Sequence, residues 1–181
     1  MVKRTETIEF IVDSFRELLK NESFDHITIH DICDNCSISR MTFYRYFRDK
    51  YELMNWVYIS QMRTIFNNNL DFSGWIVIID KMLDIIIQNS QYFMKVANTK
   101  GQNSFEEFLV SYGMEYCMLS LKKEFHDDIP TALIYAVRFY CVGTTRLVLE
   151  WIKRGMKEPK EEFRDNLCAC LPASLSAYIH F

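Results

Sequence analysis

Apolar residues recur at three- and four-residue spacing through most of the chain, which is the pattern of amphipathic helices. A first helix is predicted over residues 5–20, two short helices over residues 28–47, and a longer helix over residues 50–67. Thr28 and Ser39 stand at the expected starts of the two short helices. Their hydroxyl oxygens can accept hydrogen bonds from the unpaired backbone N–H groups of a first turn.

The rest of the chain also favours helices over strands. Further helices are predicted over residues 72–88, 91–98, 104–125, 130–154 and 159–178. Pro172 lies inside the last of these, so a kink or break is expected there. The polar residues 67–69 mark a module boundary. We therefore predict an all-α fold, with a three-helix helix-turn-helix module over residues 1–50 that the helix 50–67 joins to a helical domain over residues 68–181.

The second short helix combines a narrow apolar seam with a polar outer face. Phe43 and Phe47 are four residues apart and are expected to point inward. The residues left to face outward are Arg40, Met41, Tyr44 and Arg45. An arginine can pair with a guanine edge, hydroxyls reach phosphates or bases, and a methionine can contact a thymine methyl. This face suits a DNA groove, although a helical hairpin used only for packing is the alternative.

The stretch from Ile29 to Lys50 resembles the DNA-binding domain of the tetracycline-repressor (TetR) family of bacterial transcription regulators. The resemblance rests on the pattern Ile-x-x-Ile-x-x-x-x-x-Ile-Ser-x-x-Thr-Phe-Tyr-x-Tyr-Phe-x-x-Lys and covers roughly the first third of the chain. It implies a set of residues in the major groove or on phosphates: Thr28, His30, Ser39, Arg40, Met41, Thr42, Tyr44, Arg45, Tyr46 and Lys50. The turn position that is usually glycine is Ser37, which costs energy if its φ is positive.

The resemblance also implies a homodimer, in which the last two long helices pair with their twins. The apolar stripes of these helices supply the predicted interface residues Tyr140, Leu147, Trp151, Phe163, Leu167 and Leu171. The alternative is that both stripes pack within one chain. Two segments further resemble the branch of the family that contains the activator of dihydroxyacetone kinase operons: residues 46–56 and residues 149–155.

An effector pocket is the other feature that the resemblance implies for the C-terminal domain. The aromatic and polar residues expected to line it are Trp75, Tyr92, Tyr112, Tyr116, Phe139 and Thr144. Such a pocket would bind an unknown, partly apolar small molecule. Each of these residues could instead belong to the core.

Charge places the DNA-binding surface in a small patch. The net charge is −3, and residues 1–50 carry eight Lys and Arg against nine Asp and Glu. Four cations nevertheless fall within eleven residues, namely Arg40, Arg45, Arg48 and Lys50. Non-specific affinity for DNA should therefore be modest, with binding resting on this patch.

Several other classes of protein have little support in the sequence. Glu6 and Glu9 precede any apolar run, which argues against a secretory signal, and the apolar runs are too short to cross a membrane. We expect a cytoplasmic protein with reduced cysteines. Cys33 and Cys36 have a spacing that zinc accepts, but the pair at residues 168 and 170 is too tight, so core packing is favoured over metal. A redox role for the first pair stays open. No cofactor, metal or catalytic motif is predicted, and the protein is not expected to be an enzyme.

The function predicted from the sequence is transcription regulation, by default repression, through a palindromic operator bound by a homodimer and modulated by a small-molecule effector. One alternative is a co-regulator of the same fold that acts through a protein partner, which would form a hetero-complex without retarding DNA. The other is a helical ligand-binding protein or enzyme without DNA affinity.

Overall fold

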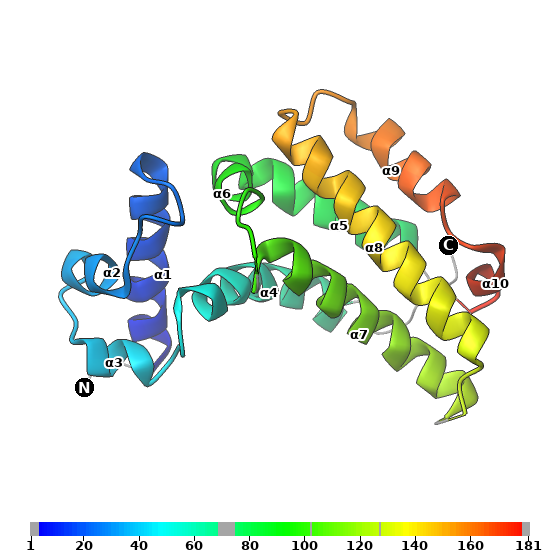
Figure 1. Ribbon diagram of the computed structural model, residues 1–181, viewed down its shortest axis with the longest axis horizontal. Helices are drawn as coiled ribbons and strands as arrows, with labels where there is room; N and C mark the ends of the chain where they lie inside the picture. The colour runs from blue at the N-terminus through cyan, green and yellow to red at the C-terminus, as the bar shows by residue number, and fades with distance from the viewer. Residues whose placement is uncertain (1–3, 69–74, 102, 127, 179–181) are drawn as a thin grey trace.

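The computed structural model describes residues 4–68, 75–101, 103–126 and 128–178, and every regular element within these ranges is a helix. The elements are α1 (Arg4–Asn21), α2 (Ile29–Asn35), α3 (Arg40–Tyr44), α4 (Lys50–Asn68), α5 (Trp75–Gln88), α6 (Ser90–Val96), α7 (Phe105–Phe125), α8 (Thr131–Lys153), α9 (Lys160–Ala169) and α10 (Ala173–Ser176). Helices α1–α3 form a head at one end of the molecule, and α4 connects it to a body of α5–α10 (Figure 1). The predicted all-α fold is confirmed.

The head is built around α1, which packs on the two short helices. Phe15, Ile32 and Phe43 are fully buried, one from each helix. The buried Ser14 hydroxyl donates to the Ile32 carbonyl over 2.8 Å, and the Asn35 amide donates to the Ser14 hydroxyl oxygen over 3.1 Å. These bonds tie α2 to α1, because short helices cannot bury enough surface to be stable alone.

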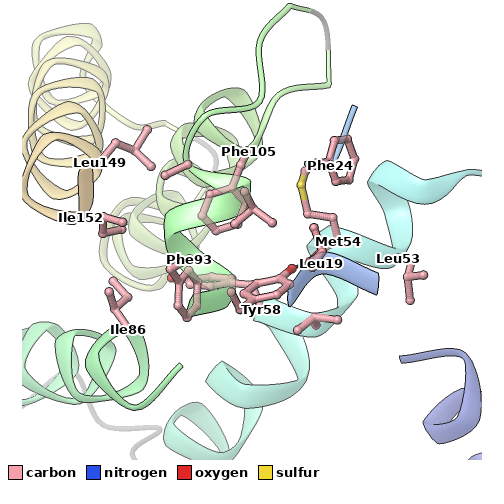
Figure 2. Close-up of a cluster of buried hydrophobic side chains, with 14 of the residues drawn as sticks. Leu19, Phe24, Leu53, Met54, Tyr58, Ile86, Phe93, Phe105, Leu149 and Ile152 are labelled. Atoms are coloured by element: carbon pink, nitrogen blue, oxygen red, sulfur yellow. Dashed lines mark hydrogen bonds between the residues drawn. The ribbon is translucent and has the colours of Figure 1, made fainter. Parts of the chain in front are cut away.

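The core continues from the head into the body through α4 and α6. Labelled side chains of α1, α4, α5, α6, α7 and α8 fill one cluster in Figure 2. The Tyr58 ring of α4 meets Phe93 of α6 and Phe105 of α7 edge-on, with ring centroids 6.3 and 5.8 Å apart. The Tyr92 hydroxyl donates to the Met54 carbonyl over 2.8 Å. The head is therefore not packed as a separate unit.

The body is a layered bundle in which α7 and α8 run side by side and α9 lies along α5 (Figure 1). Ion pairs fasten α9 to α5. Lys160 lies 3.0 Å from Asp80 and 2.8 Å from Asp84, and Arg164 lies 2.9 Å from Asp80. This contact fixes the C-terminal segment against the middle of the chain.

The last predicted helix breaks where the sequence indicated, and the second short helix ends earlier than predicted. The single helix expected over residues 159–178 is two, because Cys170 ends α9 and Pro172 precedes α10, so the expected break at Pro172 is confirmed. Helix α3 ends at Tyr44, before Phe47. The backbone N–H groups of Arg45 and Tyr46 bond three residues back, which tightens the last turn, yet Phe47 is still buried.

Helix α8 is apolar enough by length and composition to cross a membrane. One of its faces is instead covered by the body, where Val137, Cys141, Val148 and Ile152 are buried. A core helix of a helical bundle meets the same test of composition. Its opposite face carries exposed apolar side chains.

Candidate nucleic-acid interface

The first short helix starts at a reciprocal cap. The Thr28 hydroxyl oxygen accepts from the Asp31 backbone N–H over 3.2 Å, and the Asp31 carboxylate accepts from the Thr28 backbone N–H over 2.8 Å. Hydrogen bonds from the Thr28 hydroxyl and backbone lower the pKa of Asp31. The cap at Thr28 was expected from the sequence, whereas its Asp31 half was missed. The Thr-x-x-Asp spacing, a variant of the capping-box pattern, was the available signal.

The turn between the two short helices requires an unusual backbone angle. Ser37 has φ 54°, so a serine occupies a left-handed conformation that favours glycine. The Ile38 N–H donates to the Cys33 carbonyl over 3.0 Å and closes the turn. The predicted cost at Ser37 therefore applies, and the turn keeps its shape through this bond and the half-buried side chains of Cys36 and Ile38.

Helix α3 presents one side to solvent and is held by the other. Ser39 caps it by accepting from the Thr42 N–H over 3.1 Å, and fully buried Phe43 anchors it beside Phe47. Met41 is 77% exposed and Tyr44 is 55% exposed. Such large side chains are usually covered in a globular protein, so their exposure on a rigid five-residue helix indicates a contact surface.

The other predicted DNA contacts fall around this surface. Arg40 and Arg45 are exposed beside Met41 and Tyr44, whereas Thr42 and Tyr46 are half-buried. His30 is exposed on α2 and its Nδ1 lies 3.2 Å from the Asp34 carboxylate. Among the ion pairs of the described residues, none uses Arg40 or Arg45, while Arg48 pairs with Glu52 over 3.2 Å. These two arginines are thus available to phosphates or bases.

The Lys50 side chain makes hydrogen bonds within the chain. Its Nζ donates to the carbonyl oxygens of Phe24 (2.8 Å), Asp25 (3.1 Å) and Ile27 (2.8 Å), and it lies 4.6 Å from the Phe24 ring centroid. Burial lowers the pKa of its ammonium group. The side chain therefore joins the start of α4 to the α1–α2 loop. Its predicted phosphate contact stays a prediction, and this structural role was missed.

Replacing Lys50 by methionine should destabilise the protein by about 1–3 kcal/mol, because hydrogen bonds from a charged donor to three carbonyls are lost. Arg48→Met is the matched control, since the Arg48 side chain is 87% exposed, and it should change stability by about 0.5 kcal/mol or less. Urea unfolding of both variants measures the difference. Equal stability of the two variants would contradict the anchoring role of Lys50.

The cysteines near the turn are packed rather than paired. Cys33 is buried, and the half-buried Cys36 thiol donates to the Ile32 carbonyl over 3.1 Å. Burial raises the pKa of both thiols. Groups of three or more metal-binding side chains are absent from the described part of the chain.

A second concave feature lies inside the body. An apolar cavity of about 100 Å³ is bounded by α4, α5, α7, α8 and α9, with Tyr58, Tyr112, Tyr140, Thr144 and Met82 among its walls. Burial raises the pKa of the Tyr58 hydroxyl far above its ordinary value, so this group stays neutral. The cavity supplies hydroxyl groups in an otherwise apolar space.

Two of the six predicted pocket residues, Tyr112 and Thr144, line this cavity. The prediction is wrong for Phe139, which is 77% exposed on the opposite face of α8, and for Tyr92, whose hydroxyl is bound at the α4–α6 junction. Tyr116 is not among the cavity residues that the structure describes. Trp75 begins α5, but its side chain lies outside the described part.

The predicted dimer residues mostly face the interior of one chain. The prediction is wrong for Tyr140, Trp151, Phe163 and Leu167, which are buried in the body. Trp151 stacks on Phe163 with centroids 4.8 Å apart, and the Tyr140 hydroxyl donates to the Leu167 carbonyl over 3.1 Å. Leu171 is half-buried against the α7–α8 core.

Leu147 alone of the predicted dimer residues is exposed. It belongs to a surface that we call the outer α8 stripe, made of Ile134, Tyr135, Phe139, Val142 and Leu147. Spacings of four and three residues place Tyr135, Phe139 and Val142 on one side of the helix, and Ile134 and Leu147 flank them. A contiguous exposed apolar stripe of this kind marks an interaction surface.

Two family models match the chain. The model described as bacterial regulatory proteins, tetR family, matches residues 11–57, which include α2, α3 and the start of α4. A second model, described as a transcriptional regulator C-terminal region, matches residues 73–172, more than half of the chain. The matched segments cover both the head and the body.

The chain is also similar to individual transcription regulators, one by sequence and two by structure. The HTH-type dhaKLM operon transcriptional activator DhaS of Lactococcus lactis subsp. lactis (strain IL1403) is 28% identical over 96 residues, 53% of this chain. The match spans about half of that relative, 51% of its length. A structure of the dihydroxyacetone kinase operon activator DhaS has a TM-score of 0.65 at 21% identity, over 96% of this chain and 98% of that one. A TetR-family regulator from Syntrophomonas wolfei str. Goettingen has a TM-score of 0.58 at 16% identity, over 92% and 93%.

Proposed function

The chain belongs to the TetR family of bacterial transcription regulators, and we propose that it binds a palindromic operator as a homodimer under the control of a small-molecule effector. In this proposal each head places α3 in a major groove of DNA. Arg40, Met41 and Tyr44 read base edges, and Arg45 holds a phosphate. The body carries the dimer contact and the effector cavity.

The observation that supports this proposal most is the surface of α3. The five-residue helix exposes Arg40, Met41 and Tyr44, and its C-cap Arg45 is exposed beside them. A cap at Ser39 and a buried anchor at Phe43 fix the orientation of the helix. Residues that are held rigidly but not used for packing are suited to reading a partner surface. The partner of a basic, hydroxyl-bearing helix of this size is the major groove.

A palindromic site follows from the dimer. The outer α8 stripe is apolar and uncovered, and a second copy of the chain would bury it by two-fold symmetry. The two heads of such a dimer would face two half-sites related by the same axis. The stripe therefore supports a homodimer through α8.

Coupling between effector and operator would run through α4. Tyr58 of this helix lines the cavity, while Lys50 at its start holds the α1–α2 loop of the head. An effector that binds one position of α4 better than another shifts the spacing of the two heads and so the operator affinity.

The sign of regulation has two candidates. Repression is the usual behaviour in the family that the sequence resembles. Activation is favoured by the similarity to a Lactococcus protein that is named as a transcriptional activator. Transcription in vitro from a promoter that carries the selected operator distinguishes them.

The test of the proposal is an Arg40→Ala variant assayed on an operator selected from a random DNA library with the wild-type protein. Loss of a base-edge contact should cost about 1–3 kcal/mol per contact and relax preference at one position of each half-site. Arg154→Ala serves as the control, because Arg154 is an exposed arginine at the end of α8 in the body, where it pairs with Glu150. Unchanged affinity and base preference in a folded Arg40→Ala protein would refute the proposed role of α3.

A further inference from the structure

The cavity in the body limits the chemistry of its ligand. Its volume of about 100 Å³ is smaller than the 150 Å³ cavity that holds benzene, so the part of a ligand inside it is no larger than benzene, with about six heavy atoms or fewer. Drug-sized molecules fill pockets several times larger.

Charged side chains are absent from the cavity walls that the structure describes. The walls are Tyr58, Ile78, Ile79, Met82, Leu109, Tyr112, Gly113, Tyr140, Cys141, Thr144, Thr145, Val148 and Leu167. An ion placed there would lose its hydration without gaining a counter-ion, which is prohibitively costly. The ligand is therefore uncharged and mostly apolar.

Two of the five hydroxyl groups on the walls donate to backbone carbonyls of the chain. The Thr144 hydroxyl donates to the Tyr140 carbonyl over 2.6 Å, and the Tyr140 hydroxyl donates to the Leu167 carbonyl over 3.1 Å. By contrast, no hydrogen bond between described residues uses the Tyr58 hydroxyl, although this side chain is only 3% exposed. Burial raises the pKa of the Tyr58 hydroxyl, and Tyr112, which also lines the cavity, raises this pKa further.

Gly113 keeps the cavity open although glycine lowers the stability of helix α7. It lies in the interior of α7, where glycine is the poorest helix former after proline. A Cβ atom there would meet Cys141 Sγ at 3.5 Å, an ordinary contact, so close helix packing does not require glycine. A larger residue at this position would instead take volume from the cavity.

We infer that the cavity binds an uncharged molecule of about six heavy atoms or fewer, apolar except for an acceptor oxygen that receives a hydrogen bond from Tyr58. Small ketones, cyclic ethers and alcohols belong to this class. The inference rests on the proposed function, since it specifies the effector of the same body. Because Tyr58 belongs to α4, such a ligand would contact the helix that leads to the head.

The test compares cyclopentanone with two analogues of the same shape, cyclopentane and the cyclopentylammonium ion. Binding to the full-length protein is followed by NMR of methyl-labelled methionines, with Met82 reporting from the cavity wall. We expect cyclopentanone to shift the Met82 signal saturably and cyclopentylammonium to leave it unchanged. Tyr58→Phe should weaken cyclopentanone binding about tenfold and leave cyclopentane binding unchanged, because only the ketone uses the hydroxyl.

Larger side chains at Gly113 test whether cyclopentanone binds inside the cavity. Gly113→Leu should abolish cyclopentanone binding. If the leucine side chain prevents folding, the milder Gly113→Ala variant is used instead and should weaken the binding. Binding that survives both substitutions, equal binding of the ammonium ion, or no binding of any probe would overturn the inference. A gel-retardation assay of the operator with the same protein samples, without ligand, tests DNA binding separately from ligand binding in the cavity. If the protein retards its operator but binds none of the probes, the inference fails and the DNA-binding role stands.

Discussion

A Phe139→Glu variant should be monomeric at micromolar concentrations at which the wild-type protein is a dimer, with unchanged helix content. Phe139 is 77% exposed at the middle of the outer α8 stripe, so a carboxylate is harmless in the monomer. In the dimer two carboxylates would be buried without partners, at a cost of several kcal/mol. The dissociation constant should therefore rise by roughly 100-fold or more. Sedimentation velocity measures it.

Phe10→Glu is the matched control for this substitution. Phe10 is 56% exposed on α1, far in sequence from the stripe, and the same change there should leave the dimer intact. Operator affinity should fall in Phe139→Glu alone, because two linked heads gain from each other's binding and single heads do not. A monomeric wild-type protein, or a Phe139→Glu protein that stays dimeric, would contradict the assignment of the interface.

The proposed dimer surface shows a limit of predictions from sequence periodicity. Helix α8 is apolar on two sides, and the stronger stripe, which contains Tyr140, Trp151 and their neighbours, suggested the interface. That stripe is the inner one, since a single chain first covers its most apolar surface. The weaker stripe around Phe139 was assigned to a pocket instead. A helix that is apolar all round does not reveal which side a partner covers.

The head was more predictable, because its elements depend on local chemistry. The caps at Thr28 and Ser39 and the inward direction of Phe43 follow from neighbouring residues, and the structure has all three. Lys50 differs, because its three acceptors lie 23 to 26 positions earlier in the chain. No spacing rule connects a lysine to carbonyls so far away. The cavity, which five helices enclose, was beyond sequence analysis for the same reason.

Phe93→Ala should lower the stability of the whole chain by about 3–5 kcal/mol, the usual cost of removing a buried phenylalanine. Phe93 is fully buried on α6 and contacts Tyr58 of α4, Tyr92 and Phe105 of α7. Its neighbour Tyr92 meets Phe15 of α1 with ring centroids 6.4 Å apart, so Phe93 lies next to the place where the head packs on the body (Figure 2). Phe10→Ala, at an exposed site, should change stability by about 0.5 kcal/mol or less.

The continuity of this core also predicts how the protein unfolds. If head and body share one core, tryptophan fluorescence and head-specific NMR signals should lose native structure at the same urea concentration. Phe93→Ala should move both transitions together. Trp56 reports from α4 beside the head, where its ring lies 6.0 Å from that of Phe47, and Trp151 reports from the body. Single-tryptophan variants that keep one of these residues follow the two regions separately. A head that keeps its own midpoint while the body is destabilised would show that residues 1–50 fold alone, and α4 would then have no packed core through which an effector could act on the head.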